Sequence, residues 1–376
     1  MKQTSAFISI YTADVSGVCS ALYELGGMTV MHDASGCNST YTTHDEPRWY
    51  DMDSMIYITG LSEMEAIMGD DEKLIHDIVT AANDLHPKFI AIAGTPIPMM
   101  IGTDFLAIAE VIENETKIPT FAIQTNGMHS YICGAGQALA EIAKRFTLDG
   151  LPQRVKSVNV LGVTPLDYSV NSSVDSIRRR LTEAGFEVLS AWAMGSTLDQ
   201  MKQAGAAEVN LVVSSTGLLA AKELQKKFGT PYVVGVPMGD QFAAVVMKSL
   251  DKAISTGKSQ IAYKRAVCDC DTVIIGENIY SESLAAALAL TKNMKVKVLC
   301  PLETEPDLLL SEDILAEDED NIMLYLQNAK AVIADPIYRR IIQPSTKFIS
   351  LPHEAFSGRI YRKNIPDLVD NIDIIQ

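Results

Sequence analysis

The sequence lacks the features that mark several large classes of protein. No uninterrupted apolar run reaches the roughly 18 residues that a membrane-spanning helix requires. The N-terminal stretch has one lysine and a short apolar segment without a small-residue cleavage site, so no signal peptide is predicted. Positive charge is scarce, because 31 lysines and arginines stand against 47 aspartates and glutamates, a net charge of −16. This balance argues against nucleic acid and against an anionic membrane surface as partners.

Cysteine is also scarce, with six in 376 residues. Such a chain is not a disulfide scaffold, so the expectation is a cytoplasmic protein with reduced thiols. In that setting a cysteine is a core residue, a metal ligand or a redox group. Cys133, Cys300 and the C-x-C pair Cys268 and Cys270 are best explained as small buried or core residues.

A nucleotide-binding loop is missing as well. The segment STGKSQ (255–260) resembles the end of a phosphate-binding loop, but Lys252 occupies the position of the first glycine and no strand precedes it. The segment CGAGQAL (133–139) has two of the three glycines of a dinucleotide fingerprint. It lies too far from its strand and is better explained as a glycine-rich helix start.

What the chain does contain is an alternation of short β-branched runs with amphipathic segments. Most of the runs are continuously apolar, which is typical of parallel strands buried on both faces. Polar links at 148–157 and 255–271 divide the chain into three α/β units, near 1–152, 153–262 and 263–376. Ligands of such sheets bind beyond the carboxyl ends of the strands, so three domains that face one another would enclose a central cleft. The expected strands are 88–94, 119–125, 157–163, 186–192, 210–215, 231–237, 271–277, 295–301, 329–336 and 347–353.

Two cysteines stand apart from the others. Cys19 and Cys37 each lie in a predicted small-residue turn, SGVCS and SGCNS. A glycine beside a thiolate lets the backbone approach closely and donate N–H groups to sulfur. Two thiolates are too few for a cluster that needs four, but a homodimer would supply the other two across its two-fold axis. The alternative, two buried cysteines that act as small apolar groups, stays open on the residues alone.

Several segments resemble one family when they are taken in order. MHDASGC resembles the H-G-P-x-G-C turn of nitrogenase component 1 subunits and their relatives, which include dark-operative protochlorophyllide reductase and the nickel-tetrapyrrole reductive cyclase. The Cys19 segment is similar to the one around the family's first cluster cysteine. GTPIPMMIGTD resembles the family's C-P-x-x-x-I-G-D-D loop, and SLPHEAFSGR resembles its G-x-P-I-x-x-R segment. The order of these landmarks covers nearly the whole chain.

The resemblance implies three Rossmann-like domains and a metal cluster at a subunit interface. It carries the cluster ligands over to Cys19 and Cys37, with Gly36 in the turn beside Cys37. The family's third cysteine falls at Thr95, which is not a thiol, so a six-thiolate, eight-iron cluster is not expected. Gly36 and Thr95 are instead the expected cofactor-binding residues beside the two ligands. Two cysteines per chain instead imply one [4Fe–4S] cluster shared by a homodimer, or by this chain and a homologous second subunit.

The resemblance also implies an oxidoreductase subunit. It would accept electrons from a separate ATP-dependent iron–sulfur reductase and reduce a small molecule, tetrapyrrole-like or unknown, in the interdomain cleft. The loop 214–223 lacks the cysteine that holds the nitrogenase cofactor, and no histidine obviously matches its partner, although His353 lies in that region. Arg339 and Arg340 are candidate carboxylate binders or plain surface residues, and no catalytic residue is assigned. The alternatives are a cofactor-assembly scaffold or carrier without turnover, and a metal-free small-molecule binding protein.

Overall fold

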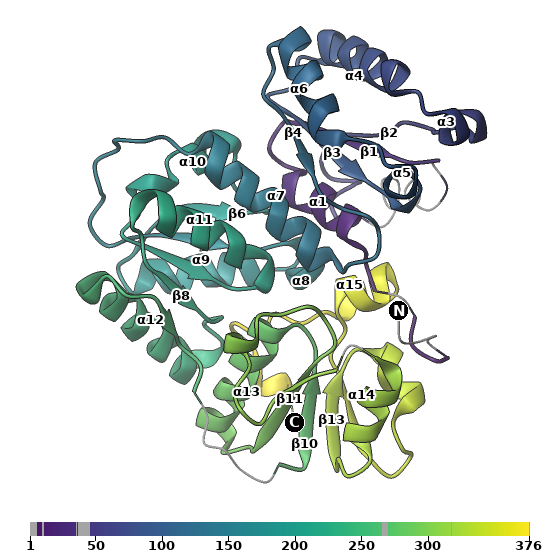
Figure 1. Cartoon of the computed structure of the whole chain (residues 1–376). Helices are drawn as coiled ribbons and strands as arrows, with labels where there is room; N and C mark the ends of the chain where they lie inside the picture. Colours follow the sequence, from purple (N-terminus) through teal and green to yellow (C-terminus); the bar gives the residue numbers. More distant parts are fainter. Residues whose placement is uncertain are drawn as a thin grey trace.

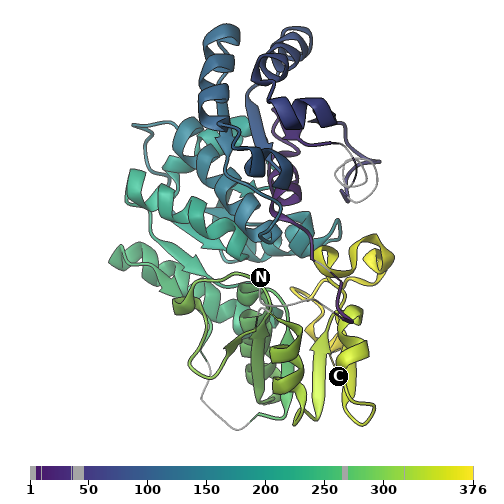
Figure 2. The same cartoon turned by 45° about the vertical axis from the view of Figure 1, so that its right-hand side comes forward.

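The computed structural model describes residues 6–9, 11–34, 36, 46–264, 270–316 and 318–375. Cys37 and Cys268 lie outside the described residues. The described chain forms three parallel sheets with helices packed around them, one in each of three bodies (Figure 1, Figure 2). This arrangement confirms the predicted fold class. Among the described residues, no helix has both the length and the hydropathy that crossing a membrane would need.

The first sheet has the strand order β2-β1-β3-β4. Apolar side chains alternate between its two faces, because successive residues of a strand point to opposite sides. Met28 and Val30 of β1 pack with helices α4 and α6 on one face, whereas Met31 packs with α1 and α7 on the other. The elements are α1 (Asp14–Leu22), β1 (Met28–His32), β2 (Met55–Ile58), α3 (Glu63–Met68), α4 (Asp71–Leu85), β3 (Ile90–Gly94), α5 (Pro96–Ile101), α6 (Phe105–Thr116), β4 (Thr120–Ile123) and α7 (Tyr131–Phe146).

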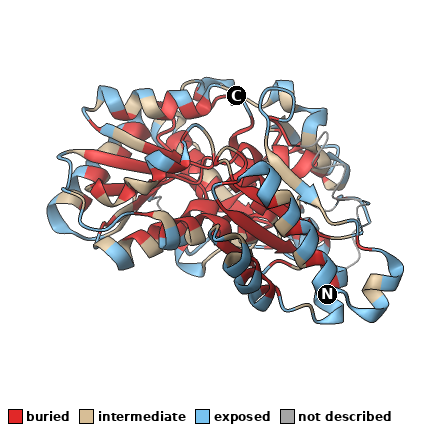
Figure 3. Ribbon diagram, turned by 90° about the horizontal axis from the view of Figure 1, so that it is seen from above, coloured by how far each residue is buried: buried red, intermediate tan, exposed pale blue. Residues whose placement is uncertain are grey.

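The second sheet has the order β6-β5-β7-β8-β9, and its central strands are wholly buried. Figure 3 shows buried strands at the centre, surrounded by helices whose outer faces are exposed. The elements are β5 (Ser157–Leu161), α8 (Pro165–Tyr168), α9 (Ser173–Glu183), β6 (Glu187–Trp192), α10 (Leu198–Lys202), β7 (Val209–Val212), α11 (Leu218–Phe228), β8 (Tyr232–Val234), α12 (Gly239–Thr256) and β9 (Gln260–Ile261).

The third sheet has the order β12-β11-β10-β13-β14. The boundaries of the three domains near 152 and 262 stay predictions, since α7 packs on α11 of the second body as well as on α1. The elements are β10 (Thr272–Ile275), α13 (Asn278–Lys292), β11 (Val296–Cys300), β12 (Ile314–Leu315), α14 (Glu319–Leu326), β13 (Ala331–Ala334), the 3-10 helix η5 (Pro336–Ile341), β14 (Lys347–Ser350) and α15 (Glu354–Ser357).

Helices α1 and α7 cross at unusually close range. A Cβ atom added to Gly17 would lie 2.2 Å from the Tyr131 carbonyl oxygen, and one added to Gly134 would lie 1.9 Å from the Asp14 carbonyl oxygen. Only glycine fits where two backbones come this close. The glycine-rich segment at 133–139 is therefore a helix start, as predicted, and its first glycine serves helix packing.

Candidate functional site

The carboxyl edge of the first sheet brings one predicted site residue against the turn after β1. Thr95 follows β3, is the N-cap residue of α5 and is 1% exposed. Its Oγ1 lies 2.9 Å from the His32 carbonyl oxygen and 2.9 Å from Asp33 Oδ1. The hydroxyl therefore donates its one proton within the chain and ties the ends of β1 and β3 together. The cofactor-binding role predicted for Thr95 stays a prediction.

Cys19 lies inside helix α1, so the predicted turn at SGVCS is wrong. Gly17 serves the crossing with α7 rather than a turn, because its missing side chain lets Tyr131 approach. The Cys19 side chain is fully buried among core residues. Burial raises the pKa of the thiol, and the nearby Glu46 carboxylate raises it further. A raised pKa favours the protonated thiol. Iron bound to the sulfur would instead favour the thiolate, because a coordinating thiol loses its proton.

Gly36 follows β1 at the same edge. Gly36 is exposed, and a Cβ atom added to it would meet nothing within 4 Å. Packing against the described residues therefore does not require a glycine at this position. Cys37 lies outside the described residues, so its distance to Cys19 and its ligand role stay predictions. Within the part of the chain that the structure describes, no three His, Cys, Asp or Glu side chains gather as a metal site requires.

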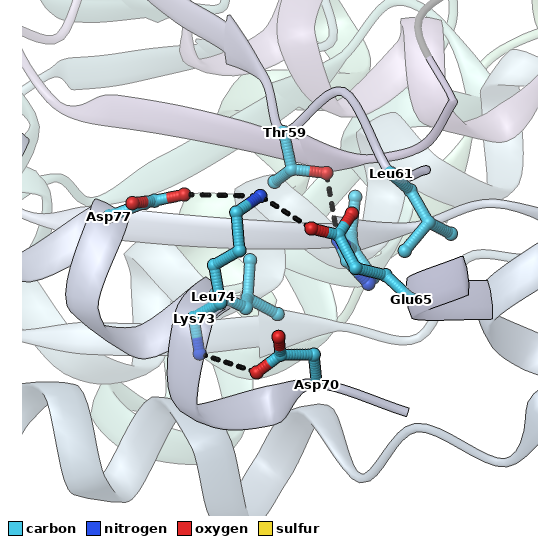
Figure 4. A pocket seen from close by; sticks show the side chains of 8 residues that line it. Thr59, Leu61, Glu65, Asp70, Lys73, Leu74 and Asp77 are labelled. Carbon is cyan, nitrogen blue, oxygen red and sulfur yellow. Dashed lines mark hydrogen bonds and ion pairs between the residues drawn. The ribbon is translucent and has the colours of Figure 1, made fainter. Parts of the chain in front are cut away.

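A small polar pocket lies beside this edge (Figure 4). Its interior volume is about 10 Å³, the space of about one water molecule. His32 Nδ1 lies 2.8 Å from Thr59 Oγ1, and Lys73 Nζ lies 2.7 Å from Glu65 Oε1. Burial lowers the pKa of His32, so its ring is neutral near pH 7. A pocket of this size has room for a water-sized group and is too small for a substrate molecule. Its lining residues are His32, Thr59, Leu61, Glu65, Asp70, Lys73, Leu74 and Asp77.

Arg48 anchors the segment that follows Cys37, a role that the sequence did not reveal. The residue is 4% exposed, and its Nε lies 2.7 Å from Oε1 of Glu46, which is 1% exposed. Its NH1 group lies 2.9 Å from Glu24 Oε1 and 2.8 Å from the Ala193 carbonyl oxygen in the second domain. Its NH2 group donates to the Ser20 carbonyl oxygen next to Cys19. One cation thus joins the candidate cluster region to the second domain.

A second polar centre lies where the three domains meet. Asp167 follows β5, and its side chain is fully buried. The carboxylate accepts hydrogen bonds from Tyr131 Oη at 2.5 Å, Thr164 Oγ1 at 2.7 Å and Ser214 Oγ at 2.6 Å. Tyr131 belongs to α7, and the other two residues follow strands of the second sheet. Loops that were expected to line the cleft therefore pack together through Asp167.

His353 approaches this carboxylate from the third domain. The residue is 9% exposed, and its ring stacks on Phe356 with centroids 4.5 Å apart. Nδ1 accepts the Ala355 N–H group, so in a neutral ring Nε2 carries the proton. Nε2 lies 3.6 Å from Asp167 Oδ1, too far for a hydrogen bond, and is buried without a hydrogen-bond partner among the described residues.

Arg339 and Arg340 do not join this centre. Both are exposed on η5, and the Arg339 guanidinium lies over the Phe348 ring, 5.3 Å from its centroid. The carboxylate-binding role predicted for them stays a prediction. The only basic group near Asp167 among the contacts described above is therefore His353.

Glu277 is a second buried carboxylate at the same junction. It is 1% exposed and accepts N–H groups from Ile279 at 3.1 Å, Tyr280 at 2.8 Å and Ser215 at 3.0 Å. Burial raises its pKa, and the charge of Asp167 raises it further. Since the folded state then binds more protons than the unfolded chain above about pH 4.5, the free energy of unfolding falls as the pH rises through this window.

Replacing Glu277 with glutamine should flatten this pH dependence. The variant loses stability at every pH, because an amide NH₂ group then faces peptide N–H groups, but it no longer titrates. We expect its free energy of unfolding to fall less between about pH 4.5 and pH 7 than that of the parent. Urea unfolding at several pH values measures how steeply the free energy of unfolding changes with pH. Glu115→Gln, at an exposed position, is the control. A slope as steep as the parent's would contradict the prediction.

Comparisons with known proteins come from sequence and from structure. A family model described as nitrogenase component 1 type oxidoreductase matches residues 16–323. The chain is 23% identical over 341 residues to a light-independent protochlorophyllide reductase subunit from Leptolyngbya boryana, covering 79% of this chain and 66% of that protein. It is 26% identical over 182 residues to the nitrogenase molybdenum-iron protein alpha chain of Clostridium pasteurianum, covering 47% of this chain and 33% of that one.

A third relative is the nitrogenase iron-molybdenum cofactor biosynthesis protein NifE of Clostridium pasteurianum, 26% identical over 179 residues, covering 47% of this chain and 38% of that protein. The chain thus spans less than two thirds of the length of each of these relatives. The solved structure "Nitrogenase Cp1 at pH 6.5" shares the fold, with a TM-score of 0.71 at 13% identity over 100% of this chain and 93% of that one. The chain belongs to the nitrogenase component 1 type oxidoreductase family.

Proposed function

We propose that this chain is the electron-accepting subunit of a nitrogenase component 1 type reductase. Cys19 and Cys37 hold a [4Fe–4S] cluster together with the same residues of a second subunit, a second copy or a homologous chain. An ATP-dependent iron–sulfur reductase supplies the electrons, which pass singly to a small molecule between the domains. The protochlorophyllide reductase relatives favour a tetrapyrrole-like substrate. The small number of cysteines favours a cytoplasmic location.

The observation that carries this proposal is the contact of Thr95 with the turn after β1. Thr95 occupies the position of the family's third cluster cysteine, and its hydroxyl is engaged by the His32 carbonyl and the Asp33 carboxylate. An internal hydrogen bond thus replaces a metal–sulfur bond at that position. Two thiolates per chain remain, and two chains supply the four that a [4Fe–4S] cluster takes.

The test is the iron and sulfide content of the chain after strictly anaerobic purification. We expect about two irons per chain, because one four-iron cluster serves two subunits. Cys19→Ala and Cys37→Ala should each lose this iron. Cys133→Ala, which changes a half-buried thiol of α7, should keep it. An iron-free parent protein, even after reconstitution with iron and sulfide, would remove the electron-transfer function and leave an α/β binding protein.

A cofactor-assembly scaffold is the second candidate function. The similarity to NifE, which is named as a biosynthesis protein, favours it. Both functions use the same cluster, so iron content does not separate them. Turnover of a tetrapyrrole such as protochlorophyllide in the presence of a reductase would favour catalysis. Release of a bound metal cluster to an acceptor protein, without substrate reduction, would favour the scaffold.

A further inference from the structure

One segment near the end of the chain carries a charge opposite to that of the whole. Residues 336–366 contain six lysines and arginines against one glutamate, Glu354, whereas the full chain has a net charge of −16. Glu354 is buried, and so are the two aspartates that flank the segment, Asp335 and Asp367. The exposed charges of this segment are therefore all positive, in a protein whose overall field is negative.

The fold gathers these charges around helix α15 (Figure 1). The 3-10 helices η5 and η6 (Gly358–Ile360) both contact α15, and η7 (Arg362–Asn364) follows η6 after one residue. No ion pair links the four exposed cations of these helices to a carboxylate among the described residues. We call this region the α15 basic surface; its residues are Arg339, Arg340, Arg359, Ile360, Tyr361 and Lys363.

A buried ion pair holds the backbone of this surface in place. Arg362 donates to Glu354 Oε1 from Nε at 2.9 Å and from NH2 at 2.6 Å. The Glu354 carboxylate also accepts the Ser169 hydroxyl of the second domain at 2.9 Å. Arg359 and Lys363 flank Arg362 in the chain, so the turns that carry them are fixed before any partner arrives. A surface that is already ordered loses less entropy on binding.

The composition of the α15 basic surface is that of a protein interface. Arginine and tyrosine are enriched in such interfaces, whereas lysine and the acidic residues are depleted. The surface has three arginines and a tyrosine against one lysine, and no exposed acid lies in its segment. Between Arg359 and Lys363, the side chains of Ile360 and Tyr361 are 76% and 37% exposed. They offer apolar contact area at the centre of a positively charged border.

We propose that the α15 basic surface binds an acidic protein partner through clustered carboxylates. Arginine matches a carboxylate with two parallel hydrogen bonds, which suits a carboxylate-bearing partner. A long polyanion such as nucleic acid would extend past this surface onto the negatively charged remainder of the chain. A compact acidic protein meets the basic surface alone. No metal cluster is involved, so this interaction goes beyond the proposed function.

Fluorescence anisotropy with a labelled glutamate-rich peptide tests the proposal on the full chain. Arg359→Gln/Lys363→Gln should raise the Kd of the peptide at least about tenfold, because each lost cation removes a charge-assisted hydrogen bond. Lys226→Gln/Lys252→Gln removes the same two charges at exposed positions of α11 and α12, so it controls for net charge. We expect this control to keep the parent's Kd. Raising NaCl from about 50 to about 500 mM should weaken the parent's binding.

Three outcomes would overturn the proposal: no peptide binding at low salt, equal losses in the two double variants, and binding that salt leaves unchanged. A DNA duplex and vesicles of phosphatidylserine are measured in the same way. Tighter binding of either one than of the peptide, lost in Arg359→Gln/Lys363→Gln, would assign the surface to that class of partner and also overturn the proposal. Because every substituted residue is exposed, both double variants should unfold at the temperature of the parent.

Discussion

Replacing Arg48 with methionine should lower the free energy of unfolding by about 3–5 kcal/mol, the usual cost of removing one partner of a buried ion pair. Arg48 and Glu46 are both nearly inaccessible to water, and Glu24 shares the same guanidinium. Methionine keeps most of the apolar stem but leaves the Glu46 carboxylate buried without its cation. The Ser20 and Ala193 carbonyl groups lose their donors as well.

Guanidinium unfolding followed by circular dichroism measures this effect in the first unfolding transition, since a chain of three domains need not unfold in one step. Arg154→Met is the matched control. Its NH1 group lies 2.8 Å from Glu187 Oε1, but both side chains are about half exposed, so its loss should cost about 1 kcal/mol or less. Arg48→Met/Glu46→Gln should recover part of the stability, because it removes the uncompensated charge. Equal losses in Arg48→Met and Arg154→Met would refute the prediction.

Replacing Gly134 with alanine should cost at least about 3 kcal/mol or prevent folding. This expected loss of stability is opposite to the effect of helix propensity, which favours alanine over glycine in a helix by about 1 kcal/mol. The added methyl group would lie 1.9 Å from the Asp14 carbonyl oxygen, a backbone atom that only a shift of α1 can move. Since α1 carries Cys19, we expect the iron content to fall together with the stability.

Gly136→Ala is the control in the same helix. Its added Cβ would have Leu219 Cδ1 as its nearest atom, at 3.3 Å, the tip of a flexible side chain. We expect a change of about 1 kcal/mol or less. Thermal unfolding of the two variants, with iron analysis of each, makes the comparison. If both variants behaved alike, the crossing of α1 and α7 would not be the tight contact that the backbone geometry describes.

Most of the fold is predictable from the sequence because its strands are short, continuous apolar runs. All ten expected strands correspond to strands of the structure. Four strands lie outside the expected set, among them the wholly buried β1. Two of the four, β9 and β12, are two-residue edge strands, and their neighbours define them more than their own side chains do. Strand β2 is only partly buried and alternates weakly, so its pattern is close to that of a loop.

The candidate site is less predictable, because its contacts join residues that are far apart in the chain. A resemblance to a family placed Cys19, Cys37 and Thr95 in one site, and the residues alone did not. No local pattern pairs Asp167 with Ser214, or His353 with Asp167, which lie 47 and 186 residues apart. Gly17 shows the converse problem. Its small size suggested a turn, whereas the structure uses it for a helix crossing that only the partner helix reveals.

The hydrogen bonds of Asp167 also affect the stability of fragments of this protein. Tyr131 reaches the carboxylate from before the second sheet, Ser214 from within it, and His353 approaches from the end of the chain. A fragment cut near residue 152 would separate Tyr131 from Asp167 and leave a buried carboxylate short of one donor. Each sheet has its own strands, but the groups around the Asp167 carboxylate come from all three parts of the chain. We therefore expect a fragment that begins near residue 152 to be less stable than the same segment in the intact chain.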